Sequence, residues 1–124
     1  MMHEEPKNLP FTIHEERLAE HRALLYIQGR LDAVTAPALK AHLKRLIQEG
    51  YTQLILDFRT VPFIDSSGLA ALVSALKLIR ESGGALKLAC LTRQTRMVFE
   101  LTLLDRIFEF YDSVEAAIAS LKSD

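Results

Sequence analysis

Two periodicities of apolar residues divide this chain into segments. Short apolar runs, alternating or continuous, are typical of strands. They occur five times, at 11–14, 23–27, 54–58, 85–91 and 107–111. Elsewhere apolar residues recur every three or four positions, as they do on the buried face of a helix. The pattern therefore predicts the element order β-β-α-β-α-β-α-β-α.

This order predicts an α/β fold, because strands that alternate with helices need crossover connections and form a largely parallel sheet. Residues 15–22 resemble a polar turn, so the first two strands should form an antiparallel hairpin. We expect one domain over residues 11–122, with a mixed, mostly parallel sheet of four to five strands and about four helices. Residues 1–10 have two prolines and no periodicity, and we expect a flexible lead-in there.

Capping residues mark the ends of the predicted helices. Ser, Thr and Asp side chains accept hydrogen bonds from the free N–H groups of a first turn, and glycine favours the left-handed conformation after a last turn. The expected caps are Thr35 with Pro37 in the first turn, Gly50 after the first helix, Thr92 before the third, and Asp112 with Glu115 as a capping box before the last.

The second helix, expected over about 67–82, has two contrasting faces when each residue is set 100° from the last. The apolar face carries Leu69, Leu72, Val73, Leu76 and Ile79. The opposite row, which we expect to point outward, is Ser67, Ala71, Ser74 and Leu78. Its small side chains would let a partner approach closely. The third helix carries the apolar residues Met97, Val98 and Leu101.

Composition narrows the possible functions. The chain has 124 residues, 49% hydrophobic and 25% charged, which is typical of one soluble domain. A net charge of −1 offers no basic field for nucleic acid or an anionic membrane, and no apolar run could span a bilayer. We expect a cytoplasmic protein, because a signal peptide is lacking and a single cysteine, Cys90, allows no intrachain disulfide. We interpret Cys90 as a small buried residue of the strand 85–91.

Residue sets for several kinds of catalysis are missing. The histidines at 3, 14, 21 and 42 lack metal-ligand spacing and all precede Ser66, against the Ser–Asp–His order of α/β-hydrolases. No glycine-rich nucleotide motif is present. Asp57, near the end of a central strand, leaves open a receiver-like domain with a phospho-accepting aspartate, although Glu15, Glu16 and Lys87 are poorly placed for it. We expect no enzyme, no metal and no cofactor.

The most informative stretch is Asp65-Ser66-Ser67-Gly68, between an apolar strand and the second helix. Carboxylate and hydroxyl groups in this position cap a helix, where free N–H groups and the helix dipole favour negative charge. The same position would hold a phosphate well. The residues alone leave two interpretations open: a helix cap only, or a cap that is also a phosphorylation switch.

The residues around this motif resemble the signature of STAS domains, and more closely that of the stand-alone bacterial anti-sigma factor antagonists. The similar stretches are 54–58, 61 and 63–69. Residues 29–35 resemble an earlier turn of that family, with Arg30 where an acidic residue is usual. Residues 92–108 resemble the family's third helix and last strand, with Leu103 where glycine is common. The resemblance covers roughly residues 11–122.

The resemblance implies a partner switch. In that family an anti-sigma factor, which is also a serine kinase, holds a sigma factor inactive, and the unphosphorylated antagonist binds the kinase and frees the sigma factor. The kinase phosphorylates the serine directly after the motif aspartate, here Ser66, and a PP2C-type phosphatase reverses this. The implied partner-binding residues are Asp32, Thr35, Asp65 and Ser67, with Ala71 and Ser74 on the outer face of the second helix.

One alternative function remains open at this point. The chain would then be a STAS subunit of another assembly, such as a stress-signalling or a lipid-transport complex. In either case we expect a monomer or a weak dimer.

Overall fold

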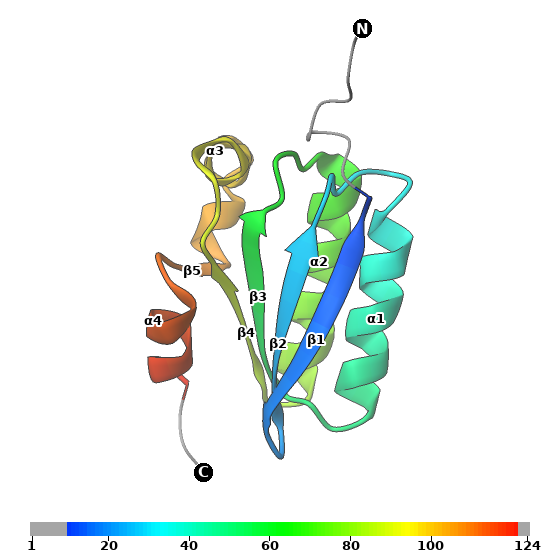
Figure 1. Ribbon diagram of the computed structural model, residues 1–124, viewed down its shortest axis with the longest axis vertical. Coiled ribbons are helices and arrows are strands. Elements are labelled where there is room, and N and C mark those ends of the chain that lie inside the picture. The colour runs from blue at the N-terminus through cyan, green and yellow to red at the C-terminus, as the bar shows by residue number, and fades with distance from the viewer. Residues whose placement is uncertain (1–9, 122–124) are drawn as a thin grey trace, which may run out of the picture.

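The strands pair in the order in which they occur in the chain. The computed structural model describes residues 10–121 (Figure 1). Its strands are β1 (Thr12–Ala19), β2 (Arg22–Gln28), β3 (Gln53–Thr60), β4 (Ala85–Ala89) and β5 (Glu109–Tyr111). β1 is antiparallel to β2, and every other neighbouring pair is parallel. The predicted mixed, mostly parallel sheet is confirmed.

The side of the sheet on which each helix lies follows from the handedness of the connections between strands. They are α1 (Ala36–Gln48), α2 (Ser66–Glu81), α3 (Arg93–Leu101) and α4 (Val114–Ala119), with a short 3-10 turn at Leu104–Arg106. Right-handed crossovers between consecutive parallel strands place their helices on the same face of a sheet. Accordingly α1 and α2 lie together behind the sheet in Figure 1, whereas α4, which follows the last strand, packs on the opposite face.

Apolar residues form a core on each face of the sheet. The larger cluster lies between the sheet and α1, α2 and α3, and the smaller lies under α4. β3 supplies both, because successive side chains of a strand point to opposite faces: Leu54, Leu56 and Phe58 belong to the first cluster and Ile55 to the second. β3 is therefore buried on both faces over most of its length.

The predicted polar turn at residues 15–22 is wrong in extent, because β1 continues to Ala19. Glu15 pairs with Leu25 of β2 and points toward α1, where its Oε1 lies 2.9 Å from Nε2 of His42 and 3.3 Å from Nη2 of Arg45. Burial acts to raise the pKa of Glu15, but hydrogen bonds from His42, Arg17 and Arg45 outweigh it and keep the pKa below its ordinary value. Glu15 is thus a strand residue whose polar side chain finds partners on α1, so the sequence shows no apolar residue at this position of the strand.

Some of the predicted helix-capping residues are confirmed and others are wrong. Gly50 has φ +97° after α1, and the Thr92 hydroxyl accepts a hydrogen bond from the N–H of Thr95, both as expected. Thr35 makes no side-chain cap for α1, because its hydroxyl bonds within the preceding turn. The capping box at Asp112 is also wrong by one residue, since Ser113 accepts the hydrogen bond from the first turn of α4.

Cys90 is not the buried strand residue that we expected. β4 ends at Ala89, and Cys90 adopts a left-handed conformation (φ 61°) just after it. Its half-buried thiol lies 3.4 Å from Nη2 of Arg59. The sequence did not indicate this turn, because Leu91 follows Cys90 and extends the apolar run beyond the end of the strand.

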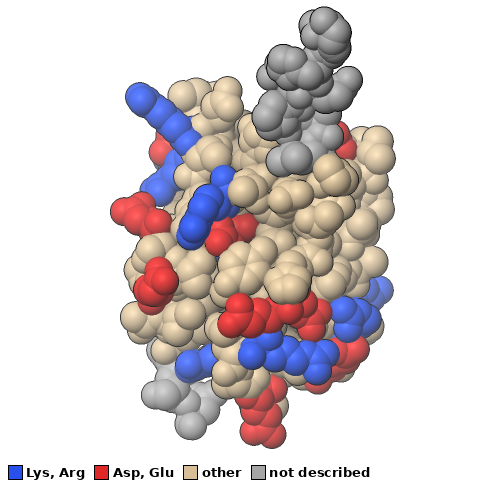
Figure 2. Space-filling view, viewed as in Figure 1, with Lys and Arg blue, Asp and Glu red and all other residues tan. Residues whose placement is uncertain are grey.

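The carboxyl ends of β2, β3 and β4 meet at one edge of the sheet, and the loops that follow them lead into α1, α2 and α3 (Figure 1). Charged side chains of both signs are interspersed on the face with β1, β2 and α4 (Figure 2). Within residues 10–121, no helix is long and apolar enough to cross a bilayer. The domain boundaries 11–122 remain a prediction, and nearly all of the expected lead-in at 1–10 lies outside the described residues.

Candidate functional site

Asp65 caps the N-terminus of α2, as predicted. It has extended backbone angles, and its Oδ1 accepts hydrogen bonds from the N–H groups of Ser67 at 2.9 Å and Gly68 at 3.2 Å. One carboxylate oxygen therefore satisfies two of the N–H groups that a first turn leaves without partners. Neither serine hydroxyl takes part in this side-chain cap.

The loop that carries this cap is held against the loop after β2. The N–H of Leu31 donates to the carbonyl of Phe63 at 2.9 Å, and the N–H of Asp65 donates to the carbonyl of Leu31 at 3.2 Å. Gly68 allows the contact, because a Cβ at this position would lie only 2.8 Å from the Leu31 carbonyl oxygen. The two loops therefore form one unit, which fixes residues 30–35 beside the start of α2.

Asp32 and Thr35 close the turn that enters α1. Oδ1 of Asp32 accepts from the N–H groups of Val34 at 3.0 Å and Thr35 at 3.2 Å, and the Thr35 hydroxyl donates to the Arg30 carbonyl at 2.7 Å. Burial acts to raise the pKa of Asp32, but the hydrogen bonds from Thr35 and Val34 outweigh it, so the pKa lies below its ordinary value. Asp32 is thus an ionised, oriented carboxylate beside the α2 N-terminus.

The two serines of the motif have different environments. Ser66 is the first residue of α2 and is exposed, and its hydroxyl has no hydrogen-bond partner among residues 10–121. Ser67 is half-buried and borders a groove between the two large helices. Ser66 is therefore the more accessible of the two serines.

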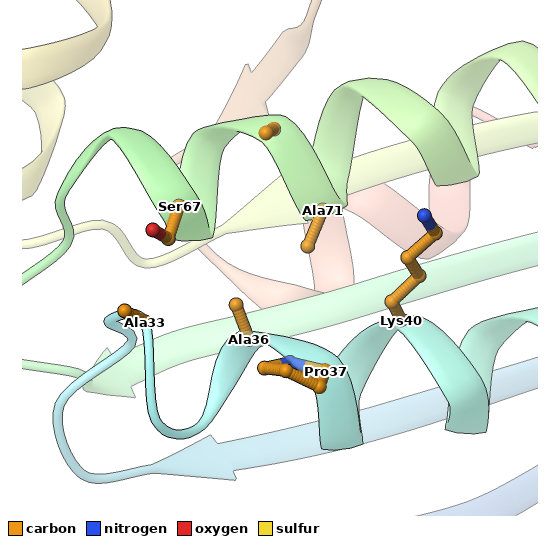
Figure 3. Close-up of a pocket in the computed structure, with 7 residues that line it drawn as sticks. Ala33, Ala36, Pro37, Lys40, Ser67 and Ala71 are labelled. Atoms are coloured by element: carbon orange, nitrogen blue, oxygen red, sulfur yellow. The ribbon is translucent and has the colours of Figure 1, made fainter.

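The groove between α1 and α2 has a volume of about 410 Å³ (Figure 3). Its walls are mostly small side chains, with a lysine that extends from α1 toward α2. The lining residues are Ala33, Ala36, Pro37, Lys40, Ser67, Ala70 and Ala71. Small side chains keep the groove open where the two helices start, so a partner's side chain could enter next to Ser66.

The predicted outward row of α2 is wrong. Ala71 is only 4% exposed, and Ser67, Ser74 and Leu78 are half-buried. Figure 3 shows Ser67 and Ala71 pointing toward α1. A helical projection assumes one buried face, but α2 packs on the sheet and also against α1, so its buried surface is wider than the projection predicts. The exposed residues of the first two turns are Ser66 and Ala70.

The structure brings most of the predicted site residues together. Asp32, Thr35, Asp65, Ser66 and Ser67 lie on the two joined loops and the first turn of α2, and Ala71 borders the groove as a buried wall. Ser74 lies farther along α2 and does not line this groove.

Several groove residues were missed by sequence reasoning. Ala33, Pro37 and Lys40 come from a different helix and loop, and no periodicity of α1 marks them as a shared wall. Asp57, in contrast, lies on the face of the sheet opposite α2, buried, with its carboxylate accepting from the N–H of Arg59 at 2.9 Å. It therefore takes no part in this site.

The chain belongs to the STAS domain family, whose model matches residues 15–117. The resemblance inferred from the motif and its flanks is thereby confirmed. The receiver-like alternative around Asp57 is not supported.

Relatives of known name agree with this assignment. The anti-sigma-B factor antagonist of Bacillus subtilis is 30% identical over 92 residues, which cover 74% of this chain and 84% of that protein. The crystal structure of protein TM1081 from Thermotoga maritima superposes with a TM-score of 0.84 at 27% identity, covering 90% of this chain and 95% of that one.

The fold is also shared with the anti-sigma factor antagonist SpoIIAA. Its unphosphorylated form has a TM-score of 0.69 at 19% identity, and its phosphorylated form, from Bacillus, has 0.70 at 21% identity. Both superpositions cover 87% of this chain, with 94% and 97% of the SpoIIAA chains. At these identities the likeness concerns the fold alone.

Proposed function

We propose that this protein is an anti-sigma factor antagonist that is switched by phosphorylation of Ser66. The observation that carries the proposal is the environment of Ser66: an exposed hydroxyl without a partner, at the start of a helix that Asp65 already caps. The names of the relatives support the antagonist function. The existence of a phosphorylated SpoIIAA structure supports the kind of modification.

Ser66 is a better acceptor than Ser67 for a geometric reason. A kinase must bring its bound ATP in line with the attacking hydroxyl. The Ser66 hydroxyl faces solvent, whereas Ser67 is half-buried and borders the α1–α2 groove.

The phosphate would act on the partner and leave the fold intact. A phosphoserine carries about −1.5 to −2 charges, which free N–H groups and the helix dipole tolerate at an N-terminus. The carboxylates of Asp65 and Asp32 already lie at this end of the molecule. Added negative charge therefore makes this surface more anionic and raises the cost of desolvating it in an interface.

The proposed cycle has two protein partners. The unphosphorylated chain binds an anti-sigma factor that is also a serine kinase and so releases a sigma factor. The kinase supplies ATP and transfers its phosphoryl group to Ser66, and a PP2C-type phosphatase removes it. The cycle requires no cofactor of the antagonist itself and operates in the cytoplasm.

A pull-down from host lysate tests the proposal. The baits are wild type, Ser66→Ala and Ser66→Asp, with Ala116→Asp as a control that adds the same charge at an exposed position of α4. Captured proteins are identified by mass spectrometry. We expect all baits except Ser66→Asp to retain an ATP-binding kinase. If all four retain the same non-kinase proteins, Ser66 does not control binding, and a STAS subunit of another assembly becomes the better description.

A further inference from the structure

Helix α3 exposes apolar side chains that the fold does not use. Its buried residues are Thr95 and Phe99, and Phe99 packs edge-on against Phe108 and Phe110. Met97 is 48% exposed and Leu101 is 77% exposed. Of the apolar residues that the sequence placed on this helix, Val98 packs against the core, whereas Met97 and Leu101 do not enter it. Because they follow one another by four residues, they form one stripe along the helix.

This stripe forms one wall of an apolar groove of about 250 Å³. The opposite wall is the loop after β3, with Pro62, Phe63 and Ile64. Figure 1 shows α3 at the same end of the molecule as this loop and the start of α2. Exposed apolar side chains that are grouped around a hollow, and not scattered singly, are typical of a protein-binding surface.

The groove shares a loop with the Ser66 site. Phe63 and Ile64 immediately precede Asp65 and Ser66, and Leu31 holds this loop through the hydrogen bonds described above. A partner that fills the groove therefore contacts the same short loop as a partner that covers Ser66.

A cation stacked on Phe63, one of the residues that line the groove, narrows the chemistry of the partner. The guanidinium of Arg30 lies 4.0 Å from the centre of the Phe63 ring, and its Nε lies 3.7 Å from Oδ2 of Asp32. A cation that is half-exposed and stacked on the wall of an apolar groove suits a partner with a carboxylate beside an apolar side chain. Arg30 is also the residue that departs from the acidic one usual in the family resemblance.

We propose that the α3 groove is a second docking site for the anti-sigma factor that contacts Ser66, and that it accepts an apolar ridge flanked by a carboxylate. This inference rests on the proposed function. The partner then binds on both sides of the Ser66 loop. The contact at Ser66 responds to phosphorylation, whereas the contact at α3 supplies apolar area that is independent of the charge on Ser66.

Site-specific photocrosslinking in the host cell tests the inference. The photoreactive residue p-benzoylphenylalanine replaces Met97 or Leu101 in the full chain. Val34, 86% exposed in the turn between Asp32 and Thr35, is the reference position on the Ser66 side, and exposed Ala116 on α4 is the negative control. We expect positions 97, 101 and 34 to form an adduct with the same anti-sigma factor. Adding Ser66→Asp should reduce all three adducts roughly tenfold.

Each other outcome is decisive. An adduct at 34 without one at 97 or 101 overturns the α3 docking site and leaves the proposed function intact. An adduct of two copies of this chain at 97 or 101 also overturns it, because the groove then binds a second copy. No adduct at any position contradicts both proposals.

A binding measurement that does not depend on crosslinking completes the test. Leu101→Glu changes an exposed residue, so it should keep the fold, which circular dichroism verifies. We expect its affinity for the purified anti-sigma factor to fall roughly tenfold. Ala116→Glu should bind like wild type. Equal affinity of both variants contradicts the proposal.

Discussion

The loop that carries Ser66 lies between two grooves of different chemistry. On one side, the α1–α2 groove is lined by small side chains such as Ala33, Ala70 and Ser67. On the other side, the α3 groove is lined by large ones such as Phe63, Met97 and Leu101. The first groove admits close approach to the modified serine, and the second offers apolar area. One loop can thus join a contact that senses charge to a contact that supplies affinity.

The helices behind the two grooves are also held differently. α2 buries seven of its sixteen residues between the sheet and α1, whereas α3 buries only Thr95 and Phe99 among nine. Burial of apolar surface is the main stabilising contribution to a fold. The core therefore holds α2 and its first residue, Ser66, firmly in place, whereas the outer side of α3 is exposed and available for contact with a partner.

Truncation of one leucine on α2 and one on α3 should give the largest difference in the free energy of unfolding. Leu72 of α2 is fully buried, so Leu72→Ala should cost about 2–5 kcal/mol of unfolding free energy. Leu101→Ala on exposed α3 should cost no more than about 0.5 kcal/mol. Urea denaturation of both variants measures this. Equal losses would show that α3 carries as much of the core as α2 does.

Arginine at two adjacent positions of α2 should separate fold from interface. Ala71 is buried against α1, so Ala71→Arg should destabilise the protein by about 1–3 kcal/mol through overpacking. Ala70 is exposed at the same groove, and Ala70→Arg should leave stability nearly unchanged while weakening partner binding. Thermal unfolding and calorimetric titration distinguish the two effects. A stable Ala71→Arg variant would mean that the α1–α2 contact is loose.

Leu103→Gly should stabilise the α3 side by up to about 1 kcal/mol. Leu103 has φ 62°, a left-handed conformation that costs a residue with a side chain roughly 1–2 kcal/mol. Glycine removes this strain, but it loses more conformational entropy on folding, so only part of the strain energy appears as added stability. Its side chain is 57% exposed, so little packing is lost. Chemical denaturation measures the change, with Leu101→Gly as the control that should destabilise. A destabilised Leu103→Gly would show that the leucine makes contacts that outweigh its strain.

The smallest expected effect is a pH dependence that arises from Asp32. Its folded-state pKa lies below the ordinary value of 3.8, so it contributes stability above that pH and loses it as the pH falls through the folded pKa. The stability difference between wild type and Asp32→Asn should be constant above about pH 5 and shrink below 3.8. Urea unfolding at a series of pH values tests this. A difference that persists at the lowest pH would assign the effect to geometry and not to charge.

Local patterns predicted much of the fold and the centre of the site. The strands and α-helices of residues 10–121 and the Asp65 cap follow from periodicity and from side chains that bond to their own backbone neighbours. The hydrogen bonds between Leu31 and the residues Phe63 and Asp65, in contrast, are made by backbone groups. Nearly every residue has such groups, so no residue type in the sequence predicts these bonds. The burial of Ala71 likewise depends on where α1 lies.

β1 and α3 show the same limit from opposite directions. Glu15 is a strand residue whose partners, His42 and Arg45, lie about 30 positions away, so its polarity suggested a turn. Leu101 is an apolar residue at helical spacing, yet it faces solvent because Phe99 fills the core beside α3. Polarity alone therefore predicts burial only where the neighbouring element is already known.

Mapping the phosphorylated residue tests the central claim most directly. The chain is recovered from its host, and a second sample is incubated with ATP and the kinase that wild type retains; fragmentation mass spectrometry then locates the phosphate. We predict phosphate on Ser66 in both samples and none on Ser66→Ala, although Ser67 is intact. Phosphate on Ser67, or none after incubation with the retained kinase, would contradict a switch based on the exposed first residue of α2.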